Sequence, residues 1–135
     1  MTAKYLLDTN ICIYIRQNRP PKVLARFRRL TPGDAVLSII TYGELIYGAQ
    51  KSQHRDRAFE QLSELTQLLP VMPLPEESAR VYGETRAALE IQGQIIGNND
   101  LWIAAHAKAS GLTLVTNNER EFNRIPGLKV QNWVN

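Results

Sequence analysis

Short apolar segments that alternate with amphipathic helical segments place the strongest constraint on the fold of this chain. The clearest apolar segments are residues 5–7, 35–39 and 112–115. Each has the length of a buried strand and is followed by polar turn or cap residues. Strands that alternate with helices predict a parallel sheet, because right-handed crossovers place helices on both of its faces. We therefore expect an α/β fold with a mainly parallel, covered sheet.

Helical periodicity and breaker residues predict the other elements. Helices are expected at residues 11–15, after residue 21, and at 41–50, 59–69, 75–89 and 100–110. Thr41 is expected to begin one helix, and Gly111 to end the helix that Asp100 opens. Weaker strands are expected at 71–74, where neighbouring prolines favour a sheet edge, and at 129–133.

Length and composition limit the possible classes of protein. With 135 residues, 44% of them hydrophobic and 21% charged, the chain is expected to be one globular domain, residues 1–135. Its longest apolar runs have five residues, whereas a membrane helix needs about 20. The apolar N-terminal stretch ends at Asp8, which argues against a secretory signal. The one cysteine, Cys12, fits a reducing compartment, so a cytoplasmic location is expected.

The net charge of +3 is unevenly distributed. Six basic residues and no acidic residue lie between positions 16 and 33, and the rest of the chain is net acidic. The six are Arg16, Arg19, Lys22, Arg26, Arg28 and Arg29. Such a segment is expected in a protein that binds a polyanion, and an ordinary solvated helix face is the alternative.

Three acids are placed where the functional groups of open α/β sheets gather, beyond the carboxyl ends of the strands. Asp8 follows the first strand, Glu44 is expected in the first turn of the helix after the second strand, and Asp100 opens a helix behind a loop. The turn 116–118 ends the strand at 112–115. We therefore expect these acids to converge on one crevice.

Each acid also has a purely structural interpretation. Asp8 suits a turn, Glu44 suits a capping box with Thr41, and Asp100 suits the first turn of a helix. Apolar neighbours favour a site instead, because crowded carboxylates beside a core repel one another unless a cation is bound. Oxygen ligands suit Mg²⁺ or Mn²⁺, and one cysteine and two histidines offer no zinc set. Both histidines, His54 and His106, are expected to be structural.

Four segments resemble the signature blocks of PIN-domain ribonucleases and, within that group, of the VapC toxins of bacterial toxin–antitoxin pairs. They are residues 6–10 (LLDTN), 38–49 (SIITYGELIYGA), 99–107 (NDLWIAAHA) and 114–122 (LVTNNEREF). The likeness extends to 125–128 (IPGL) and to Asn132 and Trp133. It therefore covers almost the whole chain.

The resemblance implies a three-layer α/β/α sandwich, a Mg²⁺ cofactor that Mn²⁺ can replace, and endonucleolytic cleavage of RNA. It also implies a structured substrate such as a tRNA anticodon loop, hence inhibition of translation, with a VapB-type antitoxin as partner and a homodimer. The family's acids match Asp8, Glu44 and Asp100. A fourth acidic position falls on either Asn118 or Glu121.

The first hypothesis is thus a metal-dependent endoribonuclease toxin, with Asp8, Glu44 and Asp100 as metal ligands. Asn118 and Glu121 join them as candidate catalytic residues, with Asn10, Thr116 and Asn117 as supporting residues. The six basic residues would bind RNA phosphates. The alternatives are a non-catalytic PIN-like module that binds RNA or a partner, and a metal-dependent phosphohydrolase of small substrates.

Overall fold

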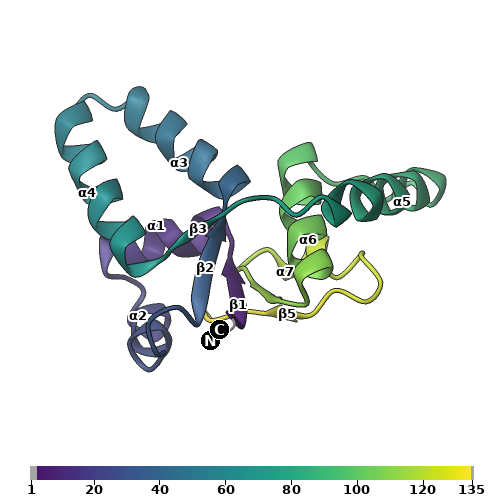
Figure 1. Ribbon diagram of the computed structural model, residues 1–135, viewed down its shortest axis with the longest axis horizontal. Coiled ribbons are helices and arrows are strands. Elements are labelled where there is room, and N and C mark those ends of the chain that lie inside the picture. The colour runs from purple at the N-terminus through teal and green to yellow at the C-terminus, as the bar shows by residue number, and fades with distance from the viewer. Residues whose placement is uncertain (1–2, 135) are drawn as a thin grey trace.

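The structure is a computed structural model that describes residues 3–134, and its centre is a five-stranded sheet (Figure 1). The strands are β1 (Tyr5–Leu7), β2 (Ala35–Ser38), β3 (Val71–Met72), β4 (Thr113–Val115) and β5 (Val130–Gln131). Their order is β3-β2-β1-β4-β5, and every pair is parallel. The chain leaves β1 toward β2 and β3 and returns to β4 on the other side, so the order reverses between β1 and β4. The expected parallel α/β fold is confirmed.

Helices connect these strands and cover both faces of the sheet. They are α1 (Thr9–Gln17), α2 (Pro21–Arg28), α3 (Ile39–Gln50), α4 (Arg55–Leu68), α5 (Glu77–Ile91), α6 (Asn98–Ser110) and α7 (Glu119–Phe122). Figure 1 shows α3 and α4 on one side of the sheet and α5 and α6 on the other. Among the helices of residues 3–134, none has both the length and the apolar character needed to cross a membrane.

Alternating strand residues build two separate hydrophobic cores, as the period of two in a strand requires. Leu7 and Leu37 face the core shared with α1, α3 and α4, where Leu45 and Leu62 pack. Their strand neighbours face a second core with α5, α6 and α7; its members include Leu6, Val36, Leu89, Leu101, Leu114 and Phe122. The sheet is therefore the middle layer of the expected three-layer sandwich.

Several predicted helix boundaries are wrong by a few residues. Helix α3 begins at Ile39 rather than at Thr41, because the Ser38 hydroxyl accepts the Ile40 N–H and caps the helix. The capping-box interpretation of Glu44, which required a cap at Thr41, is thereby excluded. Helix α6 begins at Asn98, and the short α7 was not expected at all.

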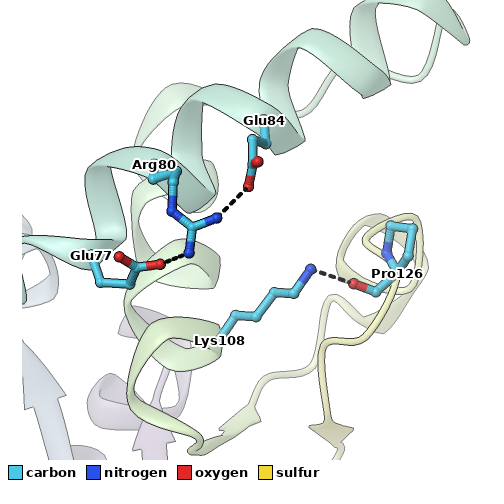
Figure 2. Close-up of polar contacts among 5 residues, drawn as sticks. All are labelled: Glu77, Arg80, Glu84, Lys108 and Pro126. Carbon is cyan, nitrogen blue, oxygen red and sulfur yellow. Dashed lines mark hydrogen bonds and ion pairs between the residues drawn. The ribbon is translucent and has the colours of Figure 1, made fainter.

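The end of α6 and the surface of α5 are held by polar contacts that Figure 2 shows. Gly111 ends α6 in the left-handed conformation, as expected, with φ of 67°. The Lys108 ammonium donates to the carbonyl of Pro126 at 2.8 Å, which ties α6 to the segment before β5. On α5, Arg80 pairs with Glu77 and Glu84, and because all three are exposed these ion pairs add little stability.

Candidate functional site

Asp8 and Thr116 meet where the strand order reverses. The register that pairs Leu7 with Val115 places the residues after these two strands side by side. Thr116 Oγ1 donates to Asp8 Oδ2 at 2.8 Å, and the Thr9 N–H donates to Asp8 Oδ1 at 2.8 Å as α1 begins. Asp8 is 5% exposed, so its carboxylate is fixed at a dry edge of the sheet.

Glu44 reaches the same place from α3. Thr9 Oγ1 donates to Glu44 Oε1 at 2.6 Å, and Asn99 Nδ2 lies 3.5 Å from Glu44 Oε2. The carboxylate of Glu44 is thus joined to the starts of both α1 and α6. Sequence reasoning did not single out Thr9 or Asn99, although each stands next to a candidate acid within a signature segment.

Asp100 and Glu121 complete the acidic group. Asp100 lies in the first turn of α6, and its pKa is raised to about 7, first by burial and then by the charges of Asp8 and Glu121. A hydrogen bond shared with Glu121 and the charge of Glu44 raise it further. Four carboxyl groups from separate elements therefore act on one another.

The Asn118 side chain is hydrogen-bonded to one of the four acids, Glu121. Its Nδ2 donates to Glu121 Oε2 at 2.9 Å, and its backbone N–H donates to Thr116 Oγ1 at 2.9 Å. Through Thr116 this turn is connected to Asp8. Of the two candidates for the fourth acidic position, Glu121 is the one whose carboxylate faces Asp100.

The crevice carries strong negative charge in a partly dry place. Burial also raises the pKa of Asp8, and the hydrogen bonds from Thr116 and Thr9 oppose this, while the charges of Glu44 and Glu121 add to it. A cavity of about 400 Å³ beside these acids is lined by Glu44, Gly97, Asn98, Asn99 and Asp100. Within residues 3–134, no three acidic, histidine or cysteine side chains are arranged closely enough to form a complete metal-binding cluster.

The donor set nevertheless has the chemistry of a site for a hard divalent cation. Carboxylate oxygens predominate, with hydroxyl and amide groups behind them, which suits Mg²⁺ or Mn²⁺. Zinc ligands are not at hand: Cys12 is fully buried, the exposed His54 precedes α4, and His106 Nδ1 lies 2.8 Å from the hydroxyl of Ser38. A cation among the acids would relieve the repulsion that adds to burial in raising the pKa values of Asp8 and Asp100.

Of the three expected supporting residues, Thr116 is the one whose side chain donates a hydrogen bond to a candidate acid, Asp8. Asn10 Nδ2 donates to Asn117 Oδ1 at 3.4 Å, and Asn117 Nδ2 donates to the hydroxyl of Tyr14 at 2.8 Å. Asn10 and Asn117 therefore join α1 to the end of β4 beside the crevice, and their side chains bond to each other and to Tyr14.

Two of the six basic residues line separate cavities. Arg16 lines a groove of about 220 Å³ that Thr9 and Glu44 also line. Arg28 lines a cavity of about 510 Å³ with Ala35, where β2 begins. Helix α2 lies at that end of the sheet in Figure 1, away from the start of α3.

Comparison with known proteins gives consistent results. The PIN domain family matches residues 5–128. A curated relative, Ribonuclease VapC2 of Haemophilus influenzae, is 43% identical over 97% of this chain and 98% of its own. The tRNA(fMet)-specific endonuclease VapC of Shigella flexneri is 42% identical over 96% of this chain and 98% of its own.

Solved structures show the same similarity. VapBC-1 from nontypeable Haemophilus influenzae matches with a TM-score of 0.89 and 42% identity, covering 97% of this chain and 98% of that one. DNA-bound VapBC from Salmonella typhimurium matches with a TM-score of 0.91 and 39% identity, covering 98% of this chain and 99% of that one.

Proposed function

This chain belongs to the PIN-domain family as a VapC-type ribonuclease toxin of a toxin–antitoxin pair, and from this premise we propose that it cleaves structured RNA with a bound divalent cation. The substrate we propose is a tRNA, cut in its anticodon loop, and the consequence is inhibition of translation. The 42% identity to a tRNA(fMet)-specific endonuclease supports a tRNA substrate. Unpaired loop nucleotides suit such an enzyme, because a protein can reach their bases and backbone without opening a helix.

One observation carries the proposal of a cation. Burial, followed by the charges of Asp8, Glu121 and Glu44, raises the pKa of Asp100 in the first turn of α6 to about 7. We assign Asp8, Glu44, Asp100 and Glu121 as the residues that would hold Mg²⁺, or Mn²⁺ in its place. When bound there, the ion supplies charge stabilisation at phosphorus and lowers the pKa of a water molecule for in-line attack.

The remaining side chains of the site hold these carboxylates in place. Thr116 and the Thr9 N–H each bind one oxygen of Asp8, and the Thr9 hydroxyl binds Glu44. Asn118 holds Glu121 in the same way. Such outer contacts orient metal ligands, and losing one typically costs about 10–100-fold in metal affinity or activity.

Arg16 is the basic residue best placed to bind a phosphate next to the bond that is cut, because its groove is continuous with Thr9 and Glu44. Arg26, Arg28 and Arg29 are exposed on and after α2 and would contact RNA farther from the acids. The proposed substrate path therefore runs from the crevice along α1.

The decisive experiment incubates antitoxin-free protein with total tRNA and with an unstructured mRNA, with Mg²⁺ or EDTA, and maps the new RNA ends. We expect Mg²⁺-dependent cuts confined to tRNA anticodon loops and none with Asp8→Asn. Binding without cleavage would favour the non-catalytic module, and hydrolysis of small phosphate esters alone would favour a phosphohydrolase.

The partner of this chain is a cognate VapB-type antitoxin, since the matched structures are VapBC complexes. Co-expression with the cognate antitoxin should yield a complex that does not cleave tRNA until the antitoxin is removed. A homodimer and a cytoplasmic location are further predictions, which sedimentation of the purified protein and cell fractionation test.

A further inference from the structure

A buried polar pair joins the two helices that carry Glu44 and Asp100. His106 Nδ1 on α6 lies 2.8 Å from the hydroxyl oxygen of Ser38, the last residue of β2 and the N-cap of α3. Ser38 is 0% exposed and His106 is 2% exposed. A polar contact between residues 68 positions apart, made in the core behind the crevice, therefore connects the two helices.

The hydrogen-bond roles of this pair follow from its surroundings. The Ser38 oxygen accepts the Ile40 N–H at 3.2 Å, which leaves the hydroxyl proton free to be donated to His106. Burial lowers the pKa of His106, so the ring is neutral at pH 7 and its Nδ1 can accept that proton. A directional chain thus runs from the first turn of α3 through Ser38 into α6.

The packing of α6 indicates why this contact matters for the position of the helix along its axis. Beside Leu101 and Ile103, its buried face includes Ala104, Ala105 and Ala107, whose small side chains resist sliding along the helix axis less than large interlocking ones do. A helix rises about 1.5 Å per residue, so a small axial slip moves every residue of α6 by the same distance. A hydrogen bond with a preferred length and direction opposes such a slip.

The spacing on the two helices is matched. Glu44 lies six residues after Ser38 on α3, and Asp100 lies six residues before His106 on α6. Each acid is therefore about 9 Å along its own helix from the contact. A displacement at Ser38 and His106 would be carried to both acids.

From this arrangement we propose that His106 is a positioning residue, which acts through Ser38 to set the separation between Glu44 and Asp100 and hence their fit to a divalent cation. This role rests on the proposed function for its effect on catalysis. His106 is not proposed as a metal ligand or a catalytic residue, because its ring contacts Ser38 and it lies six residues after Asp100 on α6.

The test compares two substitutions that differ in which ring nitrogen they imitate. His106→Asn places an amide oxygen near the position of Nδ1 and should keep the contact with Ser38, whereas His106→Gln imitates Nε2 and should lose it. His106→Leu and Ser38→Ala remove the contact from either side, and Ser38→Ala also removes the cap of α3. Lys108→Met is the matched control, because it removes another hydrogen bond of α6, to Pro126, away from α3.

The measurements are the melting temperature, Mn²⁺ affinity by calorimetry without RNA, and kcat and KM for tRNA cleavage well below the melting temperature. We expect Ser38→Ala, His106→Leu and His106→Gln to lose about 10–100-fold in kcat and in Mn²⁺ affinity with little change in KM, as for other outer contacts. His106→Asn should stay within about threefold of wild type. Lys108→Met should keep its kcat even if its melting temperature falls.

The double variant separates positioning from stability. Replacing both partners of a buried polar contact by apolar groups can leave stability nearly unchanged. Ser38→Ala with His106→Leu should thus recover melting temperature relative to the worse single variant while its kcat stays low. Recovery of kcat together with the melting temperature, or wild-type kcat and Mn²⁺ affinity in His106→Leu, would overturn the proposal.

A structural measurement keeps this inference distinct from the proposed function. Crystal structures of wild type and His106→Leu should differ by about 1 Å in the separation of the Glu44 and Asp100 carboxyl carbons, the scale of one helical rise or less. If that separation changes while wild-type protein cleaves no RNA, the proposed function fails and the positioning role stands. An unchanged separation contradicts the positioning role whatever the activity.

Discussion

The two ends of the sheet each hold a buried acid, and they use it differently. At the amino end, Asp34 accepts the N–H of Thr31 at 3.1 Å and so closes the local turn before β2. At the carboxyl end, Asp8 accepts a hydrogen bond from Thr116, which is 108 positions away. The first acid stabilises its own loop, and the second belongs to a group assembled from the whole chain.

The cavities at the two ends of the sheet differ in size and in lining, and the larger one is not the one beside the acidic group. The cavity at the amino end is larger, about 510 Å³, and mainly apolar side chains such as Leu24 and Phe27 line it. The cavity at the carboxyl end is about 400 Å³ and is lined by Glu44, Asp100 and polar neighbours. If cavity size were the only criterion, the functional site would be assigned to the amino end of the sheet. The interacting acids instead assign it to the carboxyl end, where the strand order reverses, as expected for an open α/β sheet.

After the loss of Asp8 or Asp100, the largest effect should come from replacing the fourth acid. Glu121→Gln keeps the size of the side chain and removes its charge, so we expect cleavage to fall by more than about 100-fold, beyond the usual cost of an outer contact. Asn118→Ala, which only releases Glu121, should cost about 10–100-fold. Single-turnover cleavage rates check both. The reverse order of severity would assign the fourth position to Asn118.

Basic residues at the two ends should differ in what they do for RNA. Neutralising Arg26, Arg28 and Arg29 together should reduce the slope of log K against log salt by up to about 2, since each single-strand phosphate contact contributes about 0.7. Arg16→Gln should change that slope by about 0.7 and also slow cleavage. Filter binding with an Asp100→Asn background measures the slopes, with Arg80→Gln on α5 as the charge control. An unchanged slope in the triple variant would make the α2 face an ordinary solvated surface.

The smallest effect concerns the stability of the protein in EDTA. The raised pKa of Asp100, about 7 against an ordinary 3.8, means that its protonated form favours folding. That stability is present below pH 4 and is lost as the pH rises through about 7. Asp100→Asn should therefore melt higher than wild type at pH 8, by roughly 3–5 °C for each kcal/mol that burial and repulsion of the charge cost the folded state.

At pH 5 the melting temperatures of wild type and Asp100→Asn should be closer together than at pH 8. Asp56→Asn, on the exposed surface of α4, provides the comparison. If the difference in melting temperature between Asp100→Asn and wild type does not grow with pH, the charge of Asp100 does not destabilise the folded state.

The sequence predicts much of the frame of the site because its residues mark the ends of strands. Asp8 and Thr116 each follow an apolar run, and the parallel order of the strands then brings them together. Helix α2 was expected after residue 21, and it begins at Pro21. Gly111 likewise ends α6 as expected.

The unpredicted features depend on contacts between distant positions. Thr41 and Ser38 are both plausible caps in the sequence, and only the folded chain shows that Ser38 accepts the Ile40 N–H. Helix α7 has four residues, too few for a helical period to be seen. The contact of Thr9 with Glu44 and that of His106 with Ser38 join positions 35 and 68 apart, and no local pattern encodes either.

The measurement that tests the central claim most directly is a Mg²⁺ titration of tRNA cleavage by wild type, Asp8→Asn and Asp100→Asn, with Mn²⁺ binding measured by calorimetry on the same samples. Both substitutions keep the side-chain volume and remove one charged oxygen ligand. We predict that wild type binds Mn²⁺ and loses cleavage in EDTA, and that either variant binds it at least about 10-fold more weakly and does not cleave. Cleavage by wild type that persists in EDTA, or full activity in either purified variant, would contradict the assignment of this crevice as the metal-dependent site.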